Sequence, residues 1–163
     1  MRRAAVVAIS LFSLLVAASS ASATPPTRFP LGPTDGTLEG VCPFPIGFED
    51  LQNTQVVTVF SDGRSTVTGA YKSRVTNLNT GEFVDVNAPG PITITPNSDG
   101  TLTVTGRGPT LFFFFPGDLG PGKPGALLYM TGRVVERVTG DFSAILSFRH
   151  QGGTIEDLCK TLA

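Results

Sequence analysis

Hydrophobic and polar residues alternate in short runs over most of this chain, and turn residues separate the runs. Ile92 and Ile94 alternate with threonines, and Leu102 and Val104 do the same. A period of two is typical of strands with one buried and one wet face, as in antiparallel sheets. The dipeptides Asp62-Gly63, Thr80-Gly81, Asp99-Gly100 and Thr139-Gly140 lie between runs, as hairpin turns do. The predicted strands cover 54–60, 64–78 with a break near Gly69, 82–87, 91–95, 101–106, 110–115, 126–138 with a break near Gly132, and 141–149.

This order of elements predicts an all-β domain over residues 38–163. Because hairpin follows hairpin without long crossings, an antiparallel up-and-down meander of about eight strands is favoured. We expect it to form a small closed or nearly closed β-barrel, with a β-sandwich as the alternative. A short helix is expected at the C-terminus, where Thr154 caps a segment with Ile155, Leu158, Cys159 and Leu162 on one side.

The run from Leu111 to Phe115, with four consecutive phenylalanines, departs from simple alternation. In a strand, Phe112 and Phe114 lie on one face while Leu111, Phe113 and Phe115 lie on the other, so both faces need cover. One set is expected to fill the interior. The other is either covered by the N-terminal segment or the terminal helix, or lines a ligand cavity or an interface. The residues predicted to line such a cavity are Phe113, Phe115, Tyr129 and Met130.

The Gly- and Pro-rich segment 116–125 follows the phenylalanines. A loop of this length either lies across the mouth of the barrel or is an ordinary long hairpin loop.

Residues 1–23 have the order of regions found in a secretory signal peptide: Arg2 and Arg3, an apolar run, and Ala21-Ser22-Ala23. A membrane anchor is the alternative, but it needs about twenty apolar residues, more than this run has. Cleavage after Ala23 predicts a secreted, extracellular protein without a membrane span. Residues 24–37 are rich in Pro and Thr and predict a flexible, extended leader.

Two cysteines, Cys42 and Cys159, lie near the ends of the predicted mature chain. Export places them in an oxidising compartment, which favours a disulfide. Two sulfurs are too few for a zinc site, and their spacing differs from that of a redox pair. We therefore predict a structural disulfide, which restricts the unfolded chain by closing a long loop.

Charge and candidate chemistry exclude several functions. Loss of Arg2 and Arg3 leaves 10 basic against 13 acidic residues, a net charge of about -3. The basic residues are scattered along the chain, which argues against nucleic-acid binding.

His150, the single histidine, is a weak candidate for catalysis. It could act with Glu136 or Asp141 and a serine, as in a hydrolase or nuclease, but no Gly-x-Ser-x-Gly motif is present. No cofactor or metal site is predicted, because the acidic residues Asp35, Glu39, Glu49 and Asp50 lack the spacing of a calcium loop.

Three motifs, VCPFPI from Val41, LFFFFPGDLGPG from Leu111 and DLC ending at Cys159, resemble those of small secreted actinobacterial proteins of unassigned function. The resemblance supports export and the disulfide, and implies no activity. Our leading hypothesis is a secreted binding protein that holds a small apolar molecule inside the barrel or an extracellular protein through the aromatic strand. The alternatives are a secreted hydrolase or nuclease that uses His150, and an extracellular structural protein without a pocket.

Overall fold

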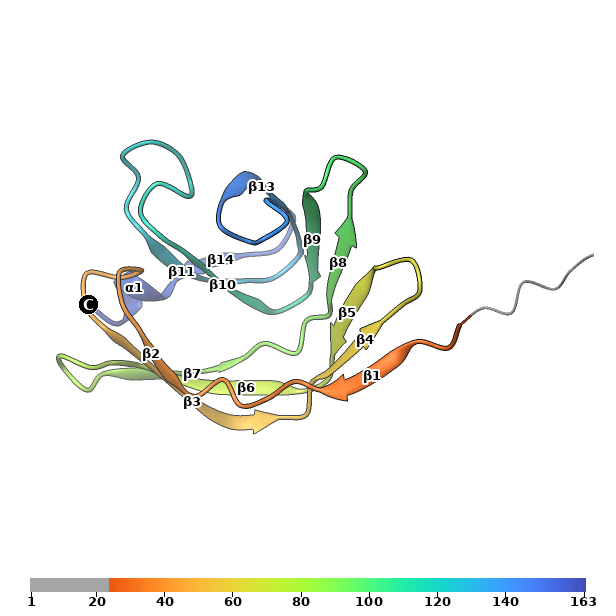
Figure 1. Cartoon of the computed structure of the whole chain (residues 1–163). Coiled ribbons are helices and arrows are strands. Elements are labelled where there is room, and N and C mark those ends of the chain that lie inside the picture. Colours follow the sequence, from red (N-terminus) through yellow and green to blue (C-terminus); the bar gives the residue numbers. More distant parts are fainter. Residues whose placement is uncertain (1–23) are drawn as a thin grey trace, which may run out of the picture.

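The computed structural model describes residues 24–163; the predicted signal peptide, residues 1–23, lies outside the described part. Fourteen strands and one short helix form in the described residues, so the all-β prediction is confirmed (Figure 1). The elements are β1 (Thr27–Pro30), β2 (Gly36–Leu38), β3 (Ile46–Asn53), β4 (Val56–Val59), β5 (Ser65–Thr68), β6 (Tyr71–Asn77), β7 (Phe83–Asn87), β8 (Ile92–Pro96), β9 (Leu102–Arg107), β10 (Thr110–Phe114), β11 (Ala126–Met130), β12 (Arg133–Val138), β13 (Ile145–Gln151), β14 (Ile155–Asp157) and α1 (Leu158–Thr161).

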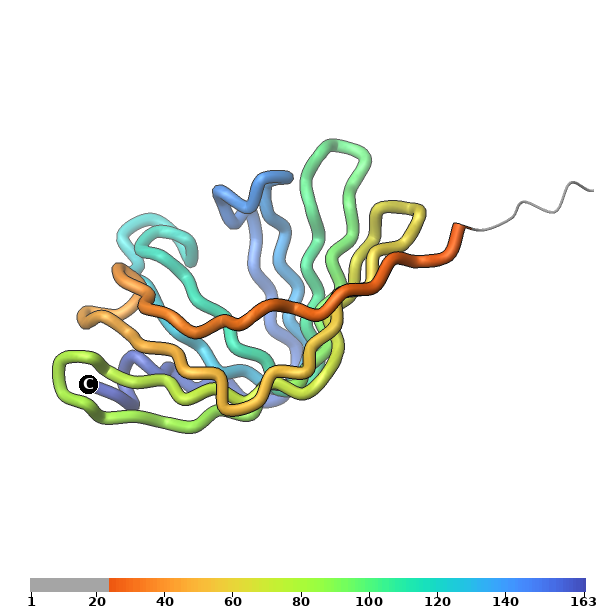
Figure 2. The backbone as a smooth tube through the Cα atoms, turned by 60° about the horizontal axis from the view of Figure 1, so that its bottom comes forward, coloured from red at the N-terminus to blue at the C-terminus, as the bar shows by residue number. Residues whose placement is uncertain are grey.

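The strands come in successive pairs, each pair being one long segment that bends in its middle: β1 with β2, β3 with β4, and so on to β13 with β14. Every ladder is antiparallel and joins segments that are neighbours in the sequence. Figure 2 shows these segments side by side in chain order. The predicted meander is therefore present. The predicted breaks near Gly69 and Gly132 are the bends between β5 and β6 and between β11 and β12.

The bends divide the meander into three sheets. One half of every segment joins a seven-stranded sheet of order β1-β4-β5-β8-β9-β12-β13. The other halves form a four-stranded sheet, β2-β3-β6-β7, and a three-stranded sheet, β10-β11-β14, because β7 and β10 do not pair. These two smaller sheets face each other (Figure 1). The seven-stranded sheet ends at β1 and β13, and no closed barrel is found in residues 24–163.

Gly90 lies at the point where the sheet divides. Its N–H donates to the Pro109 carbonyl at 2.7 Å. A Cβ at Gly90 would lie 2.4 Å from that carbonyl oxygen and 2.5 Å from the Arg107 carbonyl oxygen. Glycine therefore allows the backbone between β7 and β8 to touch the backbone between β9 and β10, after which β7 and β10 diverge.

Two apolar clusters cover the two faces of the three-stranded sheet. The first lies between this sheet and the four-stranded sheet and contains Val41, Cys42, Phe44, Ile46, Val75, Val86, Leu127, Leu158, Cys159 and Leu162. The second lies on the opposite face, next to β12, and contains Phe112, Phe114, Ala126, Leu128, Met130 and Val134. The facing sheets with a core between them resemble, at this end of the molecule, the sandwich alternative.

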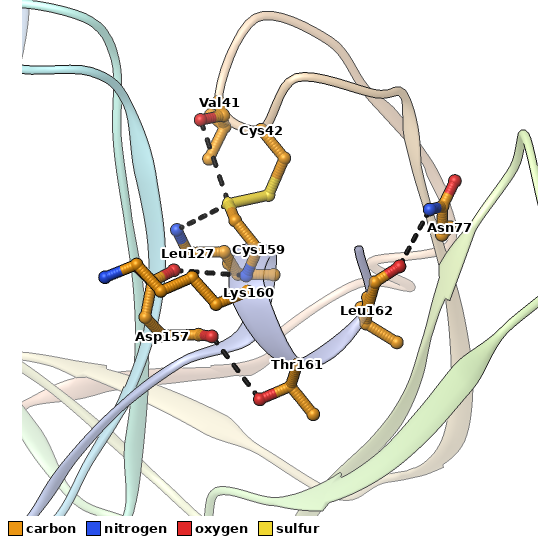
Figure 3. The surroundings of a disulfide bond; sticks show 9 residues. All are labelled: Val41, Cys42, Asn77, Leu127, Asp157, Cys159, Lys160, Thr161 and Leu162. Carbon is orange, nitrogen blue, oxygen red and sulfur yellow. Dashed lines mark hydrogen bonds and ion pairs between the residues drawn. A yellow bond between two sulfur atoms is a disulfide. The ribbon is translucent and has the colours of Figure 1, made fainter.

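The disulfide between Cys42 and Cys159 is present, as predicted, with the two Cα atoms 5.3 Å apart (Figure 3). It ties α1 into the first cluster. The Leu127 N–H donates to Cys159 Sγ at 3.3 Å, and Asn77 Nδ2 donates to the Leu162 carbonyl at 2.8 Å (Figure 3). The end of the chain is thereby attached to both smaller sheets.

The structure corrects the prediction for the C-terminal helix. Asp157 rather than Thr154 caps it, accepting a hydrogen bond from the Cys159 N–H at 3.2 Å. Ile155 belongs to β14 and is exposed instead of lying on the buried side of the helix. Pairing with β11 takes these residues into the sheet before the helix begins.

Residues 24–37 also differ from the predicted flexible leader. β1 pairs with β4, and β2, which starts at Gly36, pairs with β3, so the paired sheet begins at Thr27 rather than near Leu38. The segment is extended and mostly exposed, and backbone hydrogen bonds hold it. Its Pro and Thr residues are compatible with an edge strand, where not every N–H is needed.

The last predicted strand starts later than expected. Phe142 has a φ of 60° and is exposed in the turn before β13, which begins at Ile145. A register shift between Arg137 and Val138 interrupts the alternation, so Ile145 and Phe148 face the second cluster while Leu146 is exposed.

Candidate ligand-binding cleft

A cleft of about 360 Å³ lies between β10 and the four-stranded sheet, close to the bends of several segments. It is bordered by the place where β7 and β10 separate, because Ala88 and Gly90 line one side and β10 the other. The lining residues are Leu31, Thr34, Phe48, Gln55, Tyr71, Ala88, Gly90, Ile92, Thr110, Leu111 and Phe113. They come from all of the first five segments, so only the folded meander assembles the cleft.

The apolar part of the lining continues the first cluster. Phe48 on β3 and Leu111 on β10 pack partly against that cluster and also line the cleft. Phe113, two residues after Leu111 and on the same face of β10, is 53% exposed. The ring of Phe113 meets the ring of Phe115 edge to face, with centroids 6.1 Å apart. An aromatic side chain is therefore half exposed at the cleft, where it is available to an apolar molecule.

Thr110 on β10 borders the cleft, but its hydroxyl does not open into it. The residue is 2% exposed, and its Oγ1 is buried and makes no hydrogen bond within the described residues. Along β10, Thr110 lies on the same face as Phe112 and Phe114, whereas Leu111 and Phe113 line the cleft. A molecule in the cleft therefore does not reach Thr110 Oγ1.

Two hydroxyls at the cleft, those of Thr34 and Tyr71, belong to a hydrogen-bond chain that ends on Asp50. Thr34 Oγ1 donates to Asp50 Oδ1 at 2.5 Å, and the Thr34 N–H donates to Asp50 Oδ2 at 3.0 Å. Thr34 Oγ1 lies 2.9 Å from the Tyr71 hydroxyl. Since the Thr34 proton is used on Asp50, the Tyr71 hydroxyl is the donor of this second bond. Its oxygen retains the capacity to accept a hydrogen bond.

The Asp50 carboxylate is held in place from several sides. Burial opposes its ionisation, but hydrogen bonds from Thr34, Asn53 and Tyr71 outweigh that effect and lower the pKa of Asp50. Asn53 Nδ2 donates to Asp50 Oδ2 at 3.1 Å, and the Asp50 N–H donates to Asp35 Oδ1 at 2.6 Å. Asp50 is therefore a fixed negative charge behind the hydroxyls of the cleft.

The structure separates the four residues predicted to line a cavity. Of these, Phe113 lines the cleft. Phe115 lies next to it but beyond the cleft, and Tyr129 packs beside the first cluster, with its hydroxyl donating to the Asn87 carbonyl at 2.9 Å. Met130 is fully buried in the second cluster, on the opposite face of β11 from Tyr129. Adjacent strand residues face opposite ways, which is why Tyr129 and Met130 cannot share one cavity.

Sequence reasoning missed most of the cleft. Leu31 and Thr34 lie in the segment taken for a leader, and Phe48 lies in β3, which the predicted strands omit. β3 was not predicted, because the polar residues around Glu49 and Asp50 interrupt the alternation of apolar and polar positions. The alternation at Ile46, Gly47 and Phe48 is the one sequence signal that favours a strand here. It does not indicate which side chains Phe48 contacts.

His150 has no catalytic partner among the groups predicted for it. The side chain is partly buried on β13, and its Nε2 lies 2.7 Å from the Thr131 carbonyl oxygen. Asp141 lies in the turn at the other end of β13, where hydrogen bonds from Thr139 and Ser143 lower its pKa to about 2. Glu136 forms neither a hydrogen bond nor an ion pair with His150.

The loop 116–125 is a hairpin loop that packs beside β13. Leu119 packs against the second cluster, and Asp118 Oδ2 accepts a hydrogen bond from the Phe115 N–H at 2.7 Å. The charge of Asp118 also acts on Glu136 on β12: burial, together with this charge, raises the pKa of Glu136 to about 7.

In residues 24–163, no group of three or more His, Cys, Asp or Glu side chains is arranged to hold a metal ion. No helix there is long and apolar enough to cross a membrane.

Comparison of the chain with protein-family models, curated proteins and solved structures finds no match. The candidate site therefore stands on its own geometry: an apolar cleft with a half-exposed aromatic ring and a hydroxyl chain backed by a carboxylate.

Proposed function

We propose that this protein is exported and binds a small, mostly apolar molecule in the cleft between β10 and the four-stranded sheet. The observation that carries the proposal is a mostly apolar cleft of about 360 Å³, lined by the half-exposed Phe113 ring and by Tyr71, whose hydroxyl is held by Thr34. Small-molecule sites typically have volumes of about 300–1,000 Å³, with apolar walls and a few polar groups that orient the ligand.

Export is supported by the order of regions in residues 1–23 and by the disulfide, which suits an oxidising compartment.

Binding of a small molecule is favoured over a protein partner because the lining is concave and most of its residues are partly or fully buried. A protein partner would contact mainly the exposed rings of Phe113 and Phe115. A hydrolase centred on His150 has no support from the arrangement around that residue.

Titration of the mature chain with a neutral solvatochromic naphthalene ketone, Prodan, tests the proposal. We expect saturable binding with a blue-shifted emission, because the dye leaves water for an apolar site. Ile92→Trp places a large side chain in the cleft and should weaken binding at least tenfold. The matched control is Ile94→Trp on the same strand, because Ile94 does not line the cleft.

Circular dichroism of both variants checks that the fold is kept. Absence of saturable dye binding to the wild-type chain would refute the proposal. Equal dye affinity of folded Ile92→Trp and wild-type protein would place the dye elsewhere and also count against this cleft.

A further inference from the structure

We infer that the molecule bound in this cleft is uncharged and carries a hydroxyl group, or another N–H or O–H donor, at one end. This inference rests on the proposed function and deepens it by naming the class of ligand. It follows from the charges, the direction of the hydrogen bonds and the size of the cleft.

The charge of the site argues against an anionic ligand. The eleven lining residues include no Lys, Arg or His that could pair with a carboxylate or phosphate. The ionised group behind the lining is Asp50, whose lowered pKa keeps it negative at neutral pH. A carboxylate in the cleft would lose its water without gaining a positive partner, and it would be repelled by Asp50.

The direction of the hydrogen bonds argues for a donor on the ligand. The Tyr71 hydroxyl donates to Thr34, which donates to Asp50, so the oxygen of Tyr71, a residue that lines the cleft, is left as an acceptor. A ligand hydroxyl can donate to the Tyr71 oxygen, whereas a hydrocarbon cannot.

The size of the cleft limits the ligand. A volume of about 360 Å³ corresponds to roughly a dozen waters at about 30 Å³ each. A molecule of two fused rings or a medium-length alcohol fits this volume. The half-exposed Phe113 ring offers an aromatic face for stacking with such a molecule.

Three probes with the same ring system test the inference: 2-naphthol, 2-methylnaphthalene and 2-naphthoate, measured at pH 7 by displacement of bound Prodan. We expect 2-naphthol to bind about five- to tenfold more tightly than 2-methylnaphthalene, the effect of one net hydrogen bond. We expect 2-naphthoate to bind more weakly than both. The three differ in one substituent, so their apolar contacts are closely matched.

A variant then identifies the hydroxyl responsible. Tyr71→Phe removes the Tyr71 hydroxyl and should bring 2-naphthol and 2-methylnaphthalene to within about twofold of each other. Thr95→Val, an exposed threonine on β8 away from the cleft, is the control that should leave all affinities unchanged.

The outcomes separate the two proposals. If Prodan and all three probes fail to bind, the proposed function fails. If Prodan binds but 2-methylnaphthalene or 2-naphthoate equals or exceeds 2-naphthol, only the present inference is overturned. The same holds if the preference for 2-naphthol survives in folded Tyr71→Phe.

Discussion

The buried carboxyl group of Glu136 should make the stability of this protein fall as the pH rises. Glu136 lies on β12 opposite Phe148, is 7% exposed, and has a pKa raised from 4.5 to about 7. Burial is the main cause, and the charge of Asp118 adds to it. In the unfolded chain the group ionises near pH 4.5, while in the folded protein it holds its proton until about pH 7.

The sign follows from proton binding. Between about pH 4.5 and pH 7 the folded state holds more protons than the unfolded state, so the free energy of unfolding falls with rising pH. Each unit of pKa corresponds to about 1.36 kcal/mol, so the full effect is on the order of 3 kcal/mol and is reached above about pH 8. That is a large part of the 5–15 kcal/mol typical of a domain.

Urea unfolding of wild type and Glu136→Gln at pH 4 and pH 8 measures this effect. Because glutamine does not ionise, we expect the variant to be more stable than wild type by about 3 kcal/mol at pH 8, with most of that gain absent at pH 4. Asp118→Asn, which keeps the loop residue nearly isosteric, should recover a smaller part of the gain. A difference between wild type and Glu136→Gln that does not change with pH would refute the reasoning.

Two further predictions concern the fold. Replacing Cys42 and Cys159 together by Ala removes a cross-link between residues 117 positions apart. We expect the free energy of unfolding, measured with urea, to fall by about 4–5 kcal/mol. A loss below about 1 kcal/mol would show that the disulfide contributes little to stability. Gly90→Ala forces a Cβ against the Pro109 and Arg107 carbonyl oxygens, so we expect it to lower the melting temperature. The comparison is Gly81→Ala, at a turn where a Cβ has open space and only the φ of +80° opposes the substitution. We expect Gly90→Ala to have the lower melting temperature of the two. Equal melting temperatures for Gly90→Ala and wild type would mean that the backbone contact yields without strain.

The predicted strands succeeded where the alternation was local and regular. The Ile92 and Leu102 runs became β8 and β9, and the breaks near Gly69 and Gly132 became bends. The prediction failed for β3, because Glu49 and Asp50 obscure its apolar period, and for β14, where three residues are too few for any period. These strands exist because neighbouring strands supply their hydrogen-bond partners, and a single segment does not reveal its partners.

The candidate site was less predictable than the fold. Alternation correctly separated Phe112 and Phe114 from Phe113, because the direction of strand side chains is a local property. It did not indicate which face would be covered, nor that Leu31 and Thr34 would lie opposite Phe113. Met130 was predicted to line a cavity together with Phe113, yet it is buried in the second cluster.

The sequence by itself determined the antiparallel meander and the pairing of Cys42 with Cys159, since alternation, turn residues and two isolated cysteines act through local geometry and simple counting. The tertiary structure decided that the meander divides between β7 and β10 instead of closing into a barrel. The division depends on backbone contact at Gly90 and on packing between distant segments. The cleft arises from that division, so no single stretch of the chain encodes it.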